Sequence, residues 1–284
     1  MITINPKDLA VPKLQAYLQS AVSPRPIAFV SSIDKSGNVN LSPFSFFNMF
    51  SMNPPILVFS PSRRVRDNSE KHTLENIREV DEVVINIVNY NMVQQTSLAS
   101  CDFPKGVNEF VKSGLTPEAS QMVKPPRVKE SPVAFECKVK QVIALGDQGG
   151  AGNLVLCEVL LMHIRESVVD ANGIIDPYKI DAVARMGQNY YCRAQGDNIF
   201  VVPKPNEKVG IGYDKLPEHI RNSKVLSGND LGMLANVESI PSASKPTGEE
   251  GSVISRGAEA AHQLAQSYLR AGKIEDAWRV LQAI

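Results

Sequence analysis

Ser23-Pro24-Arg25-Pro26-Ile27-Ala28-Phe29-Val30-Ser31-Ser32 is the stretch that decides the fold of this chain. From Ile27 to Ile33 it is rich in branched and aromatic residues, a composition typical of a β-strand. Asp34 to Asn38 then supplies turn residues, and Val39 to Leu41 continues as extended chain. The pattern therefore predicts a β-hairpin.

Two further blocks follow, Asn40-Leu41-Ser42-Pro43-Phe44-Ser45-Phe46-Phe47-Asn48 and Asn53-Pro54-Pro55-Ile56-Leu57-Val58-Phe59-Ser60. Ile56 to Ser60 is a second apolar run, and the prolines before it disfavour a helix. This run is predicted to be another strand.

The segments that follow predict few helices and several strands. Pro6 to Ser20 and Ser69 to Glu79 have helical patterns, the second with Asn68 or Ser69 as its N-cap. The predicted strands are Glu82 to Val88, Val133 to Leu145 and Asn153 to Arg165. Gly146 to Gly152 separates the last two, and a hairpin turn is favoured there over a phosphate-binding loop because β-rich sequence follows it. These patterns predict a mainly β protein built on an antiparallel barrel.

Composition excludes several classes of protein. The 284 residues are 43% hydrophobic and 21% charged, which is typical of a folded globular protein. Lys+Arg and Asp+Glu each total 30, so net charge indicates no nucleic-acid or membrane partner, and we expect neither. The chain starts without an apolar leader, and its longest apolar stretch is too short to cross a bilayer, so a cytoplasmic protein is expected. The four cysteines form no CxxC pair, so we expect buried, reduced thiols and no metal site or dithiol redox motif.

The three N-terminal blocks and Asp181-Ala182-Val183-Ala184-Arg185-Met186-Gly187-Gln188-Asn189-Tyr190-Tyr191 resemble the flavin-reductase-like family of FMN-binding split barrels, in particular its flavoredoxin-type branch. The resemblance covers roughly residues 1–200. It implies a split β-barrel, an FMN cofactor and a homodimer with the flavin near the interface.

The C-terminal third lies outside this resemblance and is predicted as two parts. Residues 201–245 are rich in Pro, Gly and Asn and are expected to be an irregular connecting segment. Ser242 to Gly251 is expected to be a linker, and residues 246–284 are expected to form linker and a C-terminal helical hairpin, with Gly272 between the helices. The hairpin is similar to one tetratricopeptide unit. Because a lone unit forms no solenoid, a docked hairpin is favoured over a peptide-binding site.

The phosphate of FMN requires positive charge and hydroxyl or amide donors. Such groups lie at a strand end, in the next loop and at a helix start, where exposed N–H groups and the dipole favour an anion. The residues alone favour a solvated surface cluster at Arg63-Arg64-x-Arg66, whereas the resemblance favours a phosphate site. The resulting candidates are Ser60, Ser62, Arg63, Arg66, Lys71 and Thr73. His72 stands where relatives usually have Asp, and we hypothesise that it supplies the missing hydrogen-bond partner.

For the flavin ring, the resemblance implies contacts from the second block. Backbone amides and small hydroxyls there are expected to face N5 and the carbonyl edge of the ring, and at least one aromatic is expected to be a core residue instead. The candidates are Asn40, Ser42, Pro43, Phe44, Ser45 and Phe46, with Ser42 and Ser45 favoured. Arg25 is a further candidate for the ring or the phosphate. Arg185 either faces the cofactor or pairs with a carboxylate at the interface, and His163 is expected to be a satisfied core residue.

By resemblance, the chain is predicted to be an FMN-dependent oxidoreductase of the NAD(P)H:flavin reductase type. NADH or NADPH would be a transient hydride donor, and the electron acceptor a small molecule or a protein. The flavin carries the chemistry, so no indispensable acid or base is predicted and no catalytic residue is named. Two alternatives stay open, an FMN-carrying electron shuttle reduced by a protein partner, and a dimeric scaffold that uses the C-terminal hairpin.

Overall fold

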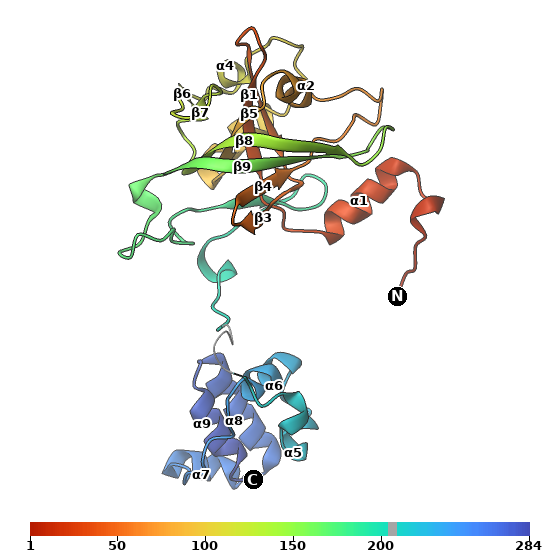
Figure 1. The fold of residues 1–284 in the computed structure, drawn as a ribbon. Helices are drawn as coiled ribbons and strands as arrows, with labels where there is room; N and C mark the ends of the chain where they lie inside the picture. The colour runs from red at the N-terminus through yellow and green to blue at the C-terminus, as the bar shows by residue number, and fades with distance from the viewer. Residues whose placement is uncertain (204–208) are drawn as a thin grey trace. The chain divides into compact units, whose positions relative to one another are not determined.

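The structure is a computed structural model that describes residues 1–203 and 209–284. It divides the chain into two compact units, Met1–Phe200 (unit 1) and Val201–Ile284 (unit 2) (Figure 1). In the described residues, no helix combines the length and the apolar character needed to cross a membrane.

Unit 1 is built on a seven-stranded antiparallel sheet with the order β2-β1-β5-β8-β9-β4-β3. Two short two-stranded sheets, β6 with β7 and β10 with β11, accompany it. The strands are β1 Ala28–Ile33, β2 Val39–Phe44, β3 Phe47–Met52, β4 Pro55–Phe59, β5 Glu82–Ile87, β6 Pro117–Glu118, β7 Arg127–Val128, β8 Val133–Ala144, β9 Asn153–Ile164, β10 Val183–Arg185 and β11 Tyr191–Arg193.

The large sheet curls around one core, although its two edge strands are not paired with each other. The edges are β2 and β3, which are consecutive in the chain and joined by Ser45 and Phe46. Phe44 of β2 and Phe59 of β4 come from opposite ends of the strand order, yet their ring centroids are 5.2 Å apart. A flat sheet would keep these rings several strand spacings apart. The fold is therefore the split barrel that the resemblance predicts.

The stretch from Ser23 to Ser32 contains most of β1 and lies at the centre of this architecture, because every residue of β1 is buried. Ala28 and Val30 face the barrel core, whereas Phe29 faces a second core on the other side of the sheet. The predicted hairpin is confirmed, with Ile33 opposite Val39. A strand buried on both faces loses the apolar–polar alternation of a half-exposed strand, which explains its nearly continuous apolar sequence.

Four α-helices accompany the sheets of unit 1, and α2 packs on β1 with Leu74 and Ile77 buried. The predicted N-cap of this helix is wrong, since Lys71 takes the cap position without a side-chain hydrogen bond. Ser69 and Asn68 instead bond to Asp67 and Arg63 in the preceding loop. The helices are α1 Val11–Ala21, α2 His72–Glu79, α3 Val93–Leu98 and α4 Glu109–Ser113.

All four cysteines are free thiols, as expected, but only two of them are buried. Cys137 and Cys157 are buried in the barrel core, and burial raises the pKa of both thiols. Cys101 is exposed and Cys192 is half-buried. The described residues also contain no cluster of three or more His, Cys, Asp or Glu side chains that could hold a metal ion.

Unit 2 is helical, and this corrects the expectation for residues 201–245. That segment contains α5 and α6, because Leu216, Ile220 and Leu234 are buried in the same core as Trp278 of the C-terminal hairpin. The expected linker at 242–251 likewise overlaps a helix, α7. The described helices of unit 2 are α5 Glu218–Arg221, α6 Gly228–Ala235, α7 Gly248–Ile254, α8 Ala258–Arg270 and α9 Ile274–Leu281.

A buried carboxylate ties α7 to the hairpin. Glu250 completes a capping box with Thr247, and its carboxylate lies 2.6 Å from the guanidinium of Arg279 on α9. The hydrogen bond from Arg279 is the main reason that the pKa of Glu250 falls to about 2. The hairpin therefore packs within unit 2.

Candidate functional site

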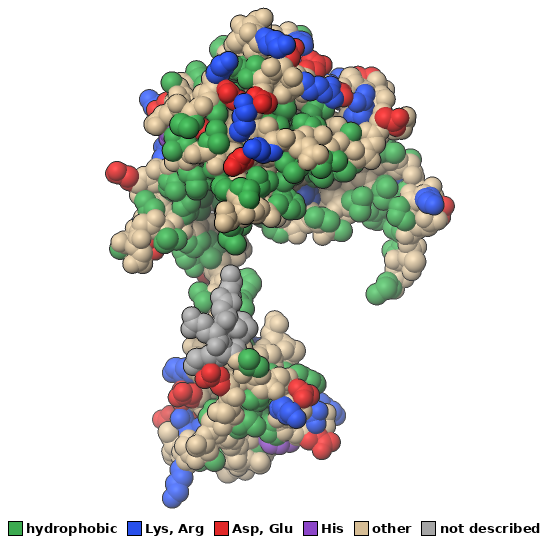
Figure 2. Space-filling view, in the orientation of Figure 1, with side chains coloured by type: hydrophobic (Ala, Val, Ile, Leu, Met, Phe, Trp, Pro, Cys, Tyr) green, Lys and Arg blue, Asp and Glu red, His purple; other side chains and the backbone are tan. Residues whose placement is uncertain are grey.

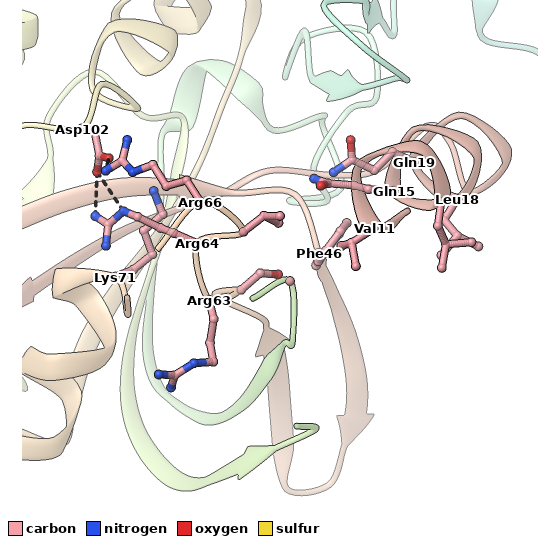
Figure 3. A pocket seen from close by; sticks show the side chains of 14 residues that line it. Val11, Gln15, Leu18, Gln19, Phe46, Arg63, Arg64, Arg66, Lys71 and Asp102 are labelled. Atoms are coloured by element: carbon pink, nitrogen blue, oxygen red, sulfur yellow. Dashed lines mark hydrogen bonds and ion pairs between the residues drawn. The ribbon is translucent and has the colours of Figure 1, made fainter. Parts of the chain in front are cut away.

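A pocket of about 540 Å³ lies in unit 1 where α1 faces the loop after β4 (Figure 3). We call it the α1 pocket. Its lining comes from α1, from the β2–β3 connection, from the loop after β4 and from the start of α2. The lining residues are Val11, Leu14, Gln15, Leu18, Gln19, Phe46, Ser62, Arg63, Arg64, Val65, Arg66, Lys71, Asp102 and Gly150.

One end of the α1 pocket is cationic. Arg64 and Arg66 converge there on the same carboxylate, Asp102, and the distance from Arg64 Nη2 to Asp102 Oδ1 is 2.6 Å (Figure 3). The ammonium group of Lys71 has no hydrogen bond or ion pair within the described residues. Burial, and then the charge of Arg64, lower the pKa of Lys71. Lys71 is therefore a half-buried cation that a bound anion would stabilise.

Arg63 lines the same pocket, but its guanidinium points away from it (Figure 3). Nε donates to Asn68 Oδ1 at 2.7 Å, and Nη1 lies 2.7 Å from Glu70 Oε1. Asn68 has a φ of +57°, so this clamp holds a left-handed residue in the loop. Arg63 and Arg66 are the arginines that the sequence predicts as phosphate ligands, whereas the arginines that pair with Asp102 at the cationic end of the pocket are Arg64 and Arg66.

The remainder of the α1 pocket is lined mainly by apolar side chains. Phe46 exposes 41% of its surface and faces α1. The predicted turn between β8 and β9 also reaches the pocket, since Gly150 N donates to Arg63 O at 2.9 Å. A Cβ on Gly150 would lie 2.9 Å from Val11 Cγ1, and a Cβ on the preceding Gly149 would lie 3.0 Å from the backbone of Val65. Glycine is therefore required at both positions for the β8–β9 turn to pack against Val11 of α1 and against Val65 in the loop after β4.

Several predicted ligands do not line the α1 pocket, and three of them instead hold the barrel together. Asn40 and Thr73 are buried, and the Asn40 amide donates to Thr73 Oγ1 at 2.8 Å. Phe44 is the core aromatic that the alternative interpretation expected. The remaining predicted residues of this group are Ser42 and Pro43 on β2, Ser45 in the β2–β3 connection and the buried Ser60 after β4.

Arg25 and Arg185 also lie outside the lining of the α1 pocket. The backbones of these two residues pair, with Arg25 N donating to Arg185 O at 2.9 Å. The Arg25 guanidinium donates to three carbonyl oxygens, those of Gln19, Val22 and Met186. Arg185 donates to a carbonyl of its own turn and stacks on Tyr191.

The two histidines that the sequence singles out have different surroundings. The side chain of His72 has no hydrogen bond within the described residues, so the hypothesis that it replaces an Asp as a hydrogen-bond partner gains no support. Burial is the main reason that its pKa is lowered. His163 is satisfied as expected, because its Nε2 lies 2.6 Å from Glu136 Oε1.

Comparison with known proteins places unit 1 in one family. Residues 20–179 match the model of the flavin reductase like domain, and the chain belongs to this family. The match covers most of unit 1 and ends before unit 2 begins.

Known relatives and solved structures agree with this assignment. The chain is 39% identical over 176 residues to an uncharacterized protein of Aquifex aeolicus, a match that covers 62% of this chain and 87% of the relative. Nitrilotriacetate monooxygenase component B from Bacillus cereus superposes with a TM-score of 0.66 at 28% identity, over 71% of this chain and 98% of that one. The 2-nitrobenzoate 2-nitroreductase NbaA of Pseudomonas fluorescens superposes with a TM-score of 0.62 at 27% identity, over 71% and 96% of the two chains.

Proposed function

We propose that the protein is an FMN-dependent oxidoreductase that holds its cofactor in the α1 pocket. The observation that carries the proposal is the unpaired ammonium of Lys71 beside Arg64 and Arg66, at one end of a pocket with an apolar wall. A phosphate dianion fits the cationic end, and a flavin ring fits a wall that includes Phe46. The membership of the flavin-reductase-like family supports the same cofactor.

The residues of the pocket suit FMN by two independent features. Its volume of about 540 Å³ lies within the range of small-molecule and cofactor sites. Lys71 also stands immediately before α2, so the first N–H groups of that helix are near the proposed phosphate position.

The work of the protein in this proposal is binding and orientation. Bound FMN would supply hydride and electron transfer, with NADH or NADPH as the hydride donor. Lys71, Arg64 and Arg66 would neutralise the phosphate, and Phe46 would cover part of the ring and exclude water. Asp102 is engaged by both arginines and is therefore not a free base. The pocket thus offers positioning and charge compensation rather than acid–base catalysis.

The proposal is tested by the visible absorption spectrum of the purified, desalted protein with FMN supplied, before and after anaerobic addition of NADH or NADPH. We expect a flavin spectrum that bleaches with one of the two. A flavin spectrum that stays oxidised with both would replace the reductase with the electron shuttle. A protein that takes up no FMN would contradict the proposal and leave the scaffold alternative.

We further propose that unit 1 forms a homodimer through an apolar groove of about 680 Å³ lined mainly by residues of β3, β4 and β9, the β3–β9 groove. Hydrophobic side chains gather over β3 and β4 on the face seen in Figure 2. Met49, Met52 and Met162 line the groove and are exposed, Met52 by 80%. Exposed apolar patches of this kind mark interfaces, and no charged side chain lines this groove. A second copy of the chain is the occupant that the family resemblance favours.

Introducing a charge into the β3–β9 groove is expected to give monomers. Met162→Lys would place an ammonium in the centre of the proposed interface, where burying it is unfavourable. Light scattering coupled to size-exclusion chromatography should show a dimer for the native chain and a monomer for this variant. Val111→Lys is the control, because Val111 is 77% exposed on α4 and lies outside the groove. A native chain that elutes as a monomer would contradict the dimer.

A further inference from the structure

Helix α1 forms one wall of the α1 pocket, although none of its residues is buried. A helix of 11 residues is marginally stable by itself in water. Gln15 and Gln19 extend from it toward the loop that carries Arg64 and Arg66 (Figure 3). Something other than a hydrophobic face must therefore hold α1 against the barrel.

Arg25 supplies the first attachment. Arg25 is only 6% exposed, and its guanidinium donates to the carbonyl oxygens of Gln19 and Val22 at the end of α1. The last carbonyls of a helix lack partners within the helix, so these bonds satisfy groups that would otherwise need water. The same guanidinium donates to Met186 O at 2.9 Å, which joins α1 to the segment that follows β10.

Gly187 is the second point of attachment, because its lack of a side chain allows Ser20 of α1 to lie directly against it. A Cβ built on Gly187 would lie 2.1 Å from Ser20 Oγ, 2.9 Å from Ser20 Cβ and 3.0 Å from Ser20 Cα. The φ of Gly187 is not in the left-handed region, so alanine is allowed there by the backbone. The requirement for glycine is therefore steric, and it comes from the end of α1.

We infer that Arg25 and Gly187 are positioning residues that fix α1 as a wall of the cofactor pocket. The inference rests on the proposed function, because it concerns the same pocket. Neither residue touches the ligand space, since neither lines the α1 pocket. Through them, the Arg185-Met186-Gly187 segment acts on the cofactor from a distance and sets the position of Gln15 and Gln19.

The test is Gly187→Ala, followed by the double variant Gly187→Ala with Ser20→Gly. The single variant is expected to bind FMN about tenfold more weakly in a fluorescence titration, because the new methyl group displaces α1. It is also expected to be cleaved faster by trypsin at the exposed Lys13 of α1 in the absence of FMN. Ser20→Gly removes the two closest atoms of the clash, so the double variant should recover most of both properties. Gly232→Ala is the control, since a Cβ there has no neighbour within 4 Å.

Unchanged cleavage at Lys13 in Gly187→Ala would overturn the inference, as would a loss that Ser20→Gly does not restore. Unchanged FMN affinity despite faster cleavage would overturn the role of α1 as a pocket wall. The cleavage assay needs no cofactor. If the native chain binds no FMN, the proposed function fails, while cleavage still decides whether Gly187 holds α1.

Discussion

Replacing Glu136 with alanine is expected to destabilise unit 1 by about 3–5 kcal/mol. Glu136 lies on β8 and is fully buried. Its carboxylate accepts the backbone N–H groups of Gln121, Met122 and Val123, with Gln121 N at 2.8 Å, and it also bonds to His163. Alanine would leave these donors without an acceptor. Water can reach the N–H groups of the exposed Gln121 and Met122 but not that of the buried Val123. The expected loss in the free energy of unfolding therefore stays within about 3–5 kcal/mol.

Urea unfolding followed by circular dichroism measures this effect, and Glu130→Ala is its matched control. Glu130 also accepts a backbone N–H, that of Thr116 at 3.1 Å, but in an exposed setting. We expect a loss of less than about 1 kcal/mol for the control. Equal losses in the two variants would show that burial of the Glu136 carboxylate is unimportant.

The effect of Glu136 is also expected to depend on pH. Burial opposes its ionisation, but the bonds from Gln121, Met122 and His163 outweigh burial and lower its pKa below the ordinary 4.5. A depressed pKa stabilises the folded state above the unfolded-state pKa, and the stabilisation is lost as the pH falls through the folded-state value. The difference between the native chain and Glu136→Ala should therefore be constant above about pH 5.5 and shrink below about pH 4.5. A difference that grows on acidification would contradict the assigned sign.

The strands of unit 1 could be predicted because their sequence signals are local. The Ile27 to Ile33 run and the turn after it define a hairpin without any tertiary information. β3 was missed because Phe47–Met52 is an edge strand with exposed side chains and no apolar alternation. The helices within 201–245 were missed for another reason. α5 and α6 are short and are stabilised by burial against α8 and α9, which a window of sequence does not contain.

The candidate site could be predicted at the level of segments but not of side chains. The Arg63-Arg64-x-Arg66 cluster and Lys71 do lie at the α1 pocket. Which arginine faces inward depends on the bonds from Arg63 to Asn68 and Glu70, and these arise from the left-handed turn at Asn68. No local pattern in α1 indicated that this exposed helix is a wall of the pocket. The signal was instead Gly187, whose need for glycine is visible only once Ser20 is placed beside it.

Replacing Lys71 with glutamate is expected to weaken FMN binding about 100-fold, and replacing it with glutamine about tenfold. Glutamine removes a charge-assisted hydrogen bond to the phosphate, and glutamate adds repulsion to that loss. Lys71 is the sharpest position for this test because its ammonium has no partner among the described residues, so its substitution breaks no ion pair of the barrel. Lys105→Gln is the control, since Lys105 lies outside the α1 pocket and pairs with Glu75 at 2.8 Å.

The decisive comparison is between FMN and riboflavin, which lacks the phosphate. If Lys71 binds the phosphate, Lys71→Gln should weaken FMN binding in a fluorescence titration and leave riboflavin binding unchanged. The FMN affinity of the native chain should also fall with added salt more steeply than that of the variant, because a charge–charge attraction is screened. An equal loss for both flavins would mean that Lys71 shapes the pocket without binding the phosphate. Phosphate binding at the cationic end would then depend on Arg64 and Arg66, whose charges Asp102 already compensates in part.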